Sequence, residues 1–269
     1  MKNLSKINRA LAAKKKLLTL VVCSLLAICT VNANDIASGT FKNGGSWKIT
    51  DQGELYVDAS TIPDFKEAAG GGGFALLTSF GYGKHRYIKS AGSTAPWFSF
   101  NSYITQIALS ENVSRIGSYA FAGLGNVKAV YIKSGSGNIQ IGEHAFEGCV
   151  NLKTMDFSRV KTIGANAFYY CLNLRGEFNC PVLTNIGKDA FEKCYGIWDA
   201  GVRFYLSGDV VVAGLDEITE SNHTGVGLWS VDFTERYEVV KAGSSVKFLV
   251  PADKRASYIS MYGEEPFMG

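Results

Sequence analysis

The side chains of this 269-residue chain that could do chemistry are few: six cysteines, three histidines and scattered carboxylates. His85, His144 and His223 stand in no recognisable nucleophile arrangement, and the chain has no G-x-S-x-G, H-E-x-x-H or G-x-x-x-x-G-K-[ST] motif. The glycines at 70–73 lack the lysine and hydroxyl that cradle a phosphate. Acid–base or covalent catalysis therefore has little support, while a hydrolase with two paired carboxylates stays open because no motif would mark it.

The cysteines offer a second kind of chemistry, redox or metal binding. Two of the six, Cys23 and Cys29, lie near the N-terminus, and the remaining four are Cys149, Cys171, Cys180 and Cys194. Four cysteines in an exported chain could form two disulfides. No C-x-x-C pair is present, which argues against zinc.

The first 33 residues have the three-part pattern of a secretory signal peptide. Six basic residues and no acidic one accompany an apolar stretch from Leu17 through Ile28, and Val31-Asn32-Ala33 predicts cleavage after Ala33. The stretch is shorter than the roughly 20 residues that span a bilayer. We expect export and no membrane span after cleavage, with an uncleaved anchor or a lipoprotein attached through Cys29 as the alternatives.

Removing the leader reverses the sign of the net charge. The remaining 236 residues carry 21 basic and 24 acidic side chains, a net charge of −3. They contain no basic tract and no interleaved arginine and aromatic stripe, so nucleic acid is not an expected partner.

The strongest signal in the sequence is an internal repeat of the phrase I-G-x-x-A-F. Its four copies start at Ile116, Ile141, Ile163 and Ile186, which are 25, 22 and 23 residues apart. A period of about 20–50 residues indicates a solenoid, whose stacked coils bury columns of side chains that no single coil could hide. The glycine suits a tight bend where a side chain or a restricted φ would be costly. The alanine suits a position where neighbouring coils approach too closely for a larger residue.

The repeat register bears on the cysteines. Cys149, Cys171 and Cys194 share one column with Leu124, three residues after each phenylalanine, as a small buried hydrophobic residue would. Stacked disulfides remain geometrically possible because adjacent strands lie about 4.8 Å apart. We predict free, buried thiols.

The register also bears on His144 and Glu147, whose spacing of three could suggest a metal pair. Other copies fill these positions with Tyr119 and Ala122, or with Asn166 and Tyr169. Surface variation is therefore the preferred interpretation, and no metal site or cofactor is expected.

Each coil contains an extended segment that predicts a short parallel strand, at residues 127–132 in the first copy and 152–157 in the second. In the third copy Glu177 falls where Met155 would align, and the spacing is one residue longer. Placing the extra residue at Gly176, as a bulge, returns Phe178 and Cys180 to inward positions.

The phrase I-G-x-x-A-F-x-x-C followed by N-L-K, as in Asn151-Leu152-Lys153, resembles the leucine-rich repeats of the BspA-like family of bacterial surface proteins. Two segments of alternating residues, 45–50 and 54–57, joined by a turn at 51–53, look like its opening hairpin. Ala95-Pro96-Trp97 resembles its lead-in, and Val246 to Pro251 followed by Tyr258 its closing segment. Only four clear phrases are present, and residues 207–245 depart from the repeat. The resemblance implies export, a curved right-handed solenoid and adhesion without catalysis, but identifies no ligand.

Repeat and resemblance together predict a mainly β leucine-rich-repeat right-handed solenoid, with short helical or 3-10 turns and β caps at both ends. The expected parts are a signal peptide (1–33), an N-terminal β cap (34–102), a repeat array (103–206) and C-terminal strands with a closing cap (207–269). Strands are expected in the last part at 208–213 and 229–233.

Two rows of outward residues on the expected concave sheet are candidates for binding a partner. The first row is Tyr131, Asp156 and Asn179, and the second is Lys128, Lys153 and Arg175. Alternatively, the first row is merely solvated and the second merely solubilising, although cations there could engage acidic partners or surface sugars.

The cap is rich in aromatic residues that could stack on sugar rings, although aromatics are normally core. They are Trp47, Tyr56, Phe65, Phe74, Phe80, Tyr82, Trp97, Phe98 and Phe100.

We therefore expect a secreted or cell-surface binding module that adheres to an extracellular protein or glycan and has no catalytic activity. The alternatives are a structural or accessory component of a cell-envelope assembly and, less favoured, a glycan-processing enzyme with two convergent carboxylates.

Overall fold

The computed structural model describes residues 34–68, 92–191, 194, 202–212, 230–232, 236–239 and 246–262. The chain divides into two compact units, Met1–Asp35 and Ile36–Gly269, and the description below concerns the second. The predicted signal peptide, Cys29, His85 and His223 lie outside the described residues.

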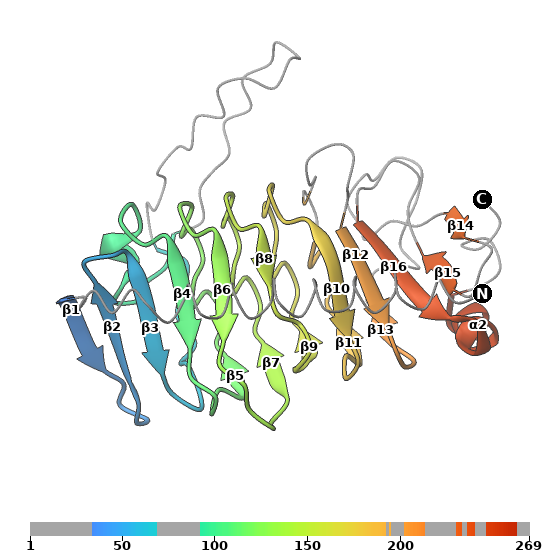
Figure 1. Cartoon of the computed structure of the whole chain (residues 1–269), viewed down its shortest axis with the longest axis horizontal. Coiled ribbons are helices and arrows are strands. Elements are labelled where there is room, and N and C mark those ends of the chain that lie inside the picture. Colours follow the sequence, from blue (N-terminus) through green and yellow to red (C-terminus); the bar gives the residue numbers. More distant parts are fainter. Residues whose placement is uncertain are drawn as a thin grey trace, which may run out of the picture. The chain divides into compact units, whose positions relative to one another are not determined.

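The first sheet has the strand order β1–β2–β3–β4–β6–β8 (Figure 1). Its strands are β1 (Asp35–Thr40), β2 (Ser46–Thr50), β3 (Glu54–Asp58), β4 (Gln106–Leu109), β6 (Ala129–Ile132) and β8 (Thr154–Met155). β2 and β3 form the antiparallel hairpin that the sequence predicts, and Gly53 closes its turn with φ +75. From β3 onward the pairing is parallel, one strand per coil, and β6 and β8 are shorter than expected.

A second parallel sheet has the order β13–β11–β9–β7–β5. Its strands are β5 (Arg115–Ile116), β7 (Ile139–Ile141), β9 (Val160–Ile163), β11 (Asn185–Ile186) and β13 (Val211–Val212). The isoleucine of each repeat phrase ends one of the first four strands. The prediction of one strand per coil was incomplete, because strands of two to four residues are too short to show an alternating pattern.

A third sheet has the order β10–β12–β16–β15–β14. Its strands are β10 (Gly176–Cys180), β12 (Val202–Leu206), β14 (Ser230–Asp232), β15 (Arg236–Val239) and β16 (Val246–Pro251). A 3-10 turn (η2, Ala252–Lys254) and an eight-residue helix (α2, Arg255–Tyr262) follow β16, and this helix was not foreseen. Buried Tyr258 ties it to the connection between β12 and β13, because its hydroxyl accepts from Val210 N at 3.0 Å and donates to Gly208 O at 3.2 Å.

A stack of aromatic rings runs through the buried core. Successive ring centroids of Trp97, Phe121, Phe146, Phe168 and Phe191 are 5.5, 5.2, 5.1 and 5.1 Å apart, with interplanar angles of 25° or less. These distances give a coil spacing of about 5 Å, which agrees with the usual spacing of paired strands. Trp97, just before η1 (Phe98–Phe100), starts the stack and donates from its indole nitrogen to Ala120 O at 2.8 Å. The lead-in residue therefore replaces the phenylalanine of a regular coil.

The glycine of the repeat phrase is required by close contact between coils. A Cβ on Gly142 would lie 2.6 Å from Ser118 N, and one on Gly187 would lie 2.3 Å from Ala165 N. Left-handed backbone is found instead two residues later, where Tyr119, His144, Asn166 and Asp189 have φ between 53 and 56°. The prediction assigned the glycine to a bend and the close approach to the alanine, whereas the structure places the close approach at the glycine itself.

The cysteines of the repeat are free and buried, as predicted. The thiols of Cys149, Cys171 and Cys194 each donate to the carbonyl of the preceding coil's phenylalanine, at 3.2, 3.3 and 3.2 Å. Burial raises the pKa of Cys149 to about 12. Gly176, at φ +113, adopts a backbone conformation that favours glycine, and beyond it Phe178 and Cys180 are buried as the bulge requires.

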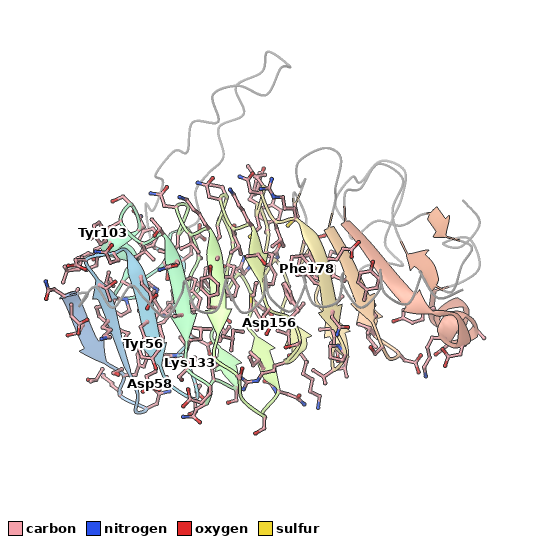
Figure 2. All side chains as sticks on the ribbon, in the orientation of Figure 1. Tyr56, Asp58, Tyr103, Lys133, Asp156 and Phe178 are labelled. Carbon is pink, nitrogen blue, oxygen red and sulfur yellow. The ribbon has the colours of Figure 1, made fainter. Side chains whose placement is uncertain are left out.

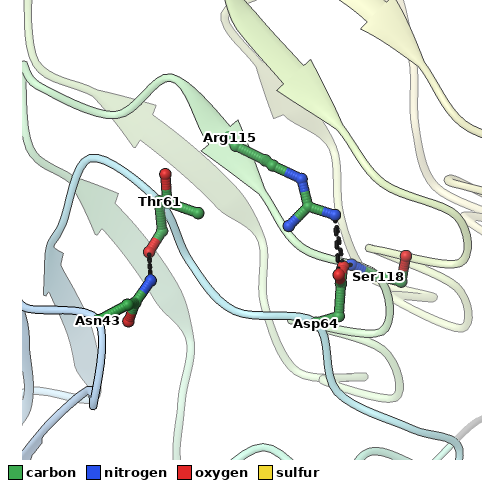
Figure 3. A network of polar contacts seen from close by, with 5 residues as sticks. All are labelled: Asn43, Thr61, Asp64, Arg115 and Ser118. Atoms are coloured by element: carbon green, nitrogen blue, oxygen red, sulfur yellow. Dashed lines mark hydrogen bonds and ion pairs between the residues drawn. The ribbon is translucent and has the colours of Figure 1, made fainter.

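The N-terminal segment docks on the first coil through backbone and side-chain bonds. Ile62 N donates to Arg115 O at 2.9 Å, and Phe65 N donates to Ser118 O at 2.8 Å. Figure 3 shows Asp64 between Arg115 and Ser118, accepting from a guanidinium nitrogen and from Ser118 N, both at 2.7 Å. Asn43 adds a bond from its amide to Thr61 O at 3.1 Å. This segment covers the edge of the array that would otherwise expose its backbone.

Candidate binding face

The outward side of the first sheet carries a row of residues fixed by strand register. Tyr56 on β3 is opposite Ala108 on β4, which is opposite Tyr131 on β6. We call these three residues the tyrosine row. Tyr131 is 56% exposed, and no hydrogen bond or ring contact of its side chain is seen within the described residues. Ala108 is too small to cover either neighbour, so Tyr131 presents a bare aromatic ring.

Lys133, two residues after Tyr131, reaches across β4 to Tyr56. Its ammonium nitrogen lies 3.4 Å from the Tyr56 hydroxyl and 4.9 Å from the centre of that ring. The bond to Tyr56 raises the pKa of Lys133, and the charges of Glu111 and Asp58 add to the effect. Figure 2 shows Tyr56, Asp58 and Lys133 close together on this face. The ring and hydroxyl of Tyr56 thus contact the ammonium group of Lys133, whereas no such contact of Tyr131 is seen within the described residues.

Asp156 lies beside Tyr131 on the next coil. Val130 pairs with Met155, and continuing that parallel register by one residue sets Asp156 opposite Tyr131. Its side chain is exposed, and one carboxylate oxygen accepts from Ser158 N at 2.8 Å. The carboxylate is therefore held in place and keeps acceptor capacity for a ligand.

Asn179, the third residue of the expected row, lies on another sheet. It is exposed on β10, opposite Tyr205 of β12, and β10 begins the third sheet while β8 ends the first. Gly176 at the start of β10 interrupts the ladder, because its φ of +113 departs from strand geometry. The structure therefore places Tyr131 and Asp156 on adjacent coils, while Asn179 lies on the coil that follows Asp156, where the rings of Phe157 and Phe178 have centroids 5.0 Å apart.

The basic residues Lys128, Lys153 and Arg175 form what we call the cation column. Lys128 N donates to Thr105 O at 2.8 Å, Lys153 N to Lys128 O at 2.9 Å, and Arg175 N to Lys153 O at 3.2 Å. Both lysines are exposed and Arg175 is half-buried. The backbone of each cation is thus bonded directly to the cation of the preceding coil or, for the first, to Thr105.

Sequence reasoning left Tyr56, Asp58, Ala108 and Lys133 out of the candidate face. Alternation in β3, where Leu55 and Val57 are buried, would have turned Tyr56 and Asp58 outward. What the sequence could not supply was the register between the hairpin and the first coil, which sets Tyr56 in line with Tyr131.

The cap aromatics divide between core and surface. Trp47 and Trp97 are buried, and Phe65, Phe98 and Phe100 pack partly buried against the core. Phe74, Phe80 and Tyr82 lie outside the described residues. Of those described, Tyr56 alone belongs to the binding face.

His144 and Glu147 contact each other directly, with His144 Nδ1 at 2.5 Å from Glu147 Oε2. The imidazole stacks on Tyr119, with ring centroids 4.6 Å apart. Burial, followed by the charges of Glu147 and other carboxylates, raises the pKa of Tyr119. Within the described part of the chain, no three potential metal ligands come together. The His144–Glu147 pair is therefore a local contact within one coil, and the stacked imidazole links it to Tyr119 of the preceding coil.

The family comparison agrees with this architecture. The family model described as "BspA type leucine rich repeat region" matches residues 94–199 in six copies. Those residues are a BspA-type leucine-rich repeat region. The six copies exceed the four clear phrases of the sequence, and the match begins just before Trp97, the first ring of the aromatic stack.

Two solved structures of leucine-rich-repeat proteins are also similar to the chain. One is a leucine-rich repeat protein from Eubacterium ventriosum (19% identity, TM-score 0.42), matched over 65% of this chain and 40% of the other. The other is a leucine rich cell surface protein from Faecalibacterium prausnitzii (18% identity, TM-score 0.35), matched over 65% of this chain and 45% of the other. The chain therefore spans less than half of each. No curated protein matches it significantly.

No helix in the described segments is both long and apolar enough to cross a bilayer.

Proposed function

We propose that this chain is an exported, surface-exposed adhesion module that binds an extracellular protein or glycan through the outward face of its first sheet. The exposed ring of Tyr131 is the observation that carries the proposal. Tyrosine is enriched at binding hot spots because it offers a large, rigid contact area together with a polar tip.

The surroundings of Tyr131 support a binding role for its ring. Ala108 leaves one flank open, Asp156 provides an acceptor on the other, and Lys133 and Asp58 place both charge signs nearby. A central aromatic with a polar, charged rim is the usual composition of a protein interface. Exposing this ring stabilises nothing in the described fold, so a partner is the simplest reason for it.

Catalysis is not part of the proposal. The carboxylates of this face, Asp58 and Asp156, are both exposed, and exposed polar groups suit the rim of an interface. Leucine-rich repeats of this type serve here as a scaffold for recognition.

The test is binding of the full chain to an array of extracellular-matrix proteins and glycans. Three forms are compared: wild type, a Tyr131→Ala/Asp156→Asn variant, and a Val211→Ala control. Val211 is 50% exposed and lies on the second sheet, so its loss removes exposed apolar surface away from the proposed face.

We expect binding that falls at least tenfold in the first variant and stays unchanged in the control, with both still folded by circular dichroism. Equal binding by all three forms would place the contact elsewhere. No binding by any form, together with stable co-purification with an envelope protein, would favour the structural or accessory role instead.

A further inference from the structure

The cation column (Lys128, Lys153 and Arg175) supports an inference about ligand class that rests on the proposed function. We propose that it binds a linear anionic polysaccharide laid across the coils, with one sulfate or carboxylate facing each cation. The cations recur once per coil, their backbones are anchored to the preceding coil, and their side chains take part in no ion pair seen among the described residues.

The column is held by two sets of bonds between coils. Besides the backbone ladder, the asparagine two residues before each cation donates to a carbonyl of the preceding coil. The bonds run from Asn126 to Ser102 O (2.8 Å), from Asn151 to Gly125 O (2.7 Å) and from Asn173 to Val150 O (2.8 Å). The Cα positions of the cations are therefore fixed relative to one another before any ligand arrives, which lowers the entropic cost of binding.

The three charges are alike and stacked, and none has an ion-pair partner in the part of the chain that the structure describes. With a coil spacing of about 5 Å, neighbouring cations repel one another, and like charges on adjacent strands are unfavourable. Among the described residues, no ion pair involves Lys128, Lys153 or Arg175. An anionic chain that crossed all three coils would relieve this repulsion.

The acidic residues nearest in sequence do not neutralise the column. Asp156, three residues after Lys153, accepts from Ser158 N, and exposed Glu177, two residues after Arg175, has an interaction of its own. Within the described residues, no ion pair joins Asp156 to a column cation.

Spacing favours a polysaccharide over an acidic peptide. An extended peptide presents same-side side chains about 6.7 Å apart, which is longer than one coil. A pyranose unit in an extended chain is about as long as one coil is thick, so a polymer with an acidic group on each sugar offers one anionic group per coil, which the long lysine and arginine side chains can reach from the sheet. Nucleic acid needs a broad basic surface, whereas the column is a single row of three cations.

The experiment measures binding of the full chain to heparin, to polygalacturonate and to neutral dextran by calorimetry at several salt concentrations. The first two probes distinguish sulfate from carboxylate as the preferred group. A triple variant, Lys128→Gln/Lys153→Gln/Arg175→Gln, removes the column. A matched control, Lys42→Gln/Lys66→Gln/Lys161→Gln, removes three exposed lysines that lie off the column, for the same change in net charge.

We expect wild type and control to bind at least one anionic polymer and not dextran. The column variant should bind at least about tenfold more weakly, with a shallower salt dependence because fewer counterions are released. Equal losses in column variant and control would reduce the effect to net charge and overturn the proposal. So would failure of wild type to bind either anionic polymer, or binding of dextran as tight as that of the anionic polymers.

The outcome is separable from the proposed function. Array binding that depends on Tyr131 but is unaffected by the column variant would leave the adhesion module standing and remove the polysaccharide from it. Polysaccharide binding that depends on the column alone would do the reverse.

Discussion

Phe146 lies in the middle of the aromatic stack, and its removal tests how neighbouring coils are held together. Its ring is fully buried and stacks on Phe121 at 5.2 Å and on Phe168 at 5.1 Å. Phe→Ala substitutions in cores cost about 3–5 kcal/mol, and each stacked pair adds about 0.5–1.5 kcal/mol beyond area burial. Because a solenoid coil contacts only its neighbours, both interfaces weaken together. We expect Phe146→Ala to lower the free energy of unfolding in urea by about 4–8 kcal/mol.

Phe146→Leu separates ring stacking from volume. Leucine keeps most of the buried apolar surface and removes both stacked contacts, so a loss of about 1–3 kcal/mol is expected. A double-mutant cycle with Phe168→Leu should give a coupling of about 0.5–1.5 kcal/mol. A coupling near zero, or an alanine variant that loses less than about 2 kcal/mol, would show that the aligned rings do not hold the coils together.

Three further perturbations test separate parts of the scaffold. Burial raises the pKa of Cys149 to about 12, so little of its thiol is ionised at pH 8. Alkylation of Cys149 in the native protein at pH 8 should therefore be about a thousandfold slower than in urea, as measured by mass spectrometry of the peptide that contains it. Equal alkylation rates would contradict burial of the thiol. The hydrogen bond from Ser118 N, followed by those from Arg115, lowers the pKa of Asp64. The ionised Asp64 therefore stabilises the fold by up to about 1 kcal/mol above about pH 4, and this stabilisation is lost as the pH falls below that value. Asp64→Asn should remove this pH dependence from the unfolding midpoints. Arg159 donates hydrogen bonds to the carbonyls of four residues on two other loops. Arg159→Lys should therefore lower the free energy of unfolding in urea by about 2–4 kcal/mol, although the charge is kept. A decrease of less than about 0.5 kcal/mol would show that these bonds contribute little.

The repeat was readable from sequence because its columns have different chemical requirements. Phenylalanine, cysteine and glycine recur at fixed offsets, and each proved to contact a neighbouring coil: ring on ring, thiol on carbonyl, and backbone on backbone. The asparagine of N-L-K was quoted as a mark of the family but given no role, and its amide bonds the preceding coil. That role depends on a contact between coils, which no single repeat displays.

The candidate face was only partly predictable. Alternation turned Tyr131 and Asp156 outward correctly, because their buried neighbours Val130, Met155 and Phe157 fix the sheet's inner side. The pairing of the hairpin with the first coil spans 52 residues of sequence between Tyr56 and Ala108, and nothing in composition sets that register. The left-handed position occupied by Tyr119 was also hidden, since tyrosine rarely marks such a backbone.

The contacts between coils also indicate where specificity resides. Every buried column of the array is constrained by the coil before it, so its residue type is limited by backbone contact, ring stacking or a required hydrogen bond. The side chains of Lys128, Lys153 and Tyr131 carry no such constraint within the described residues, while their backbones are as firmly placed as the core. A scaffold of this kind can exchange its outward residues without refolding, so substitutions at these three positions should change the ligand and leave the free energy of unfolding within about 0.5 kcal/mol of wild type.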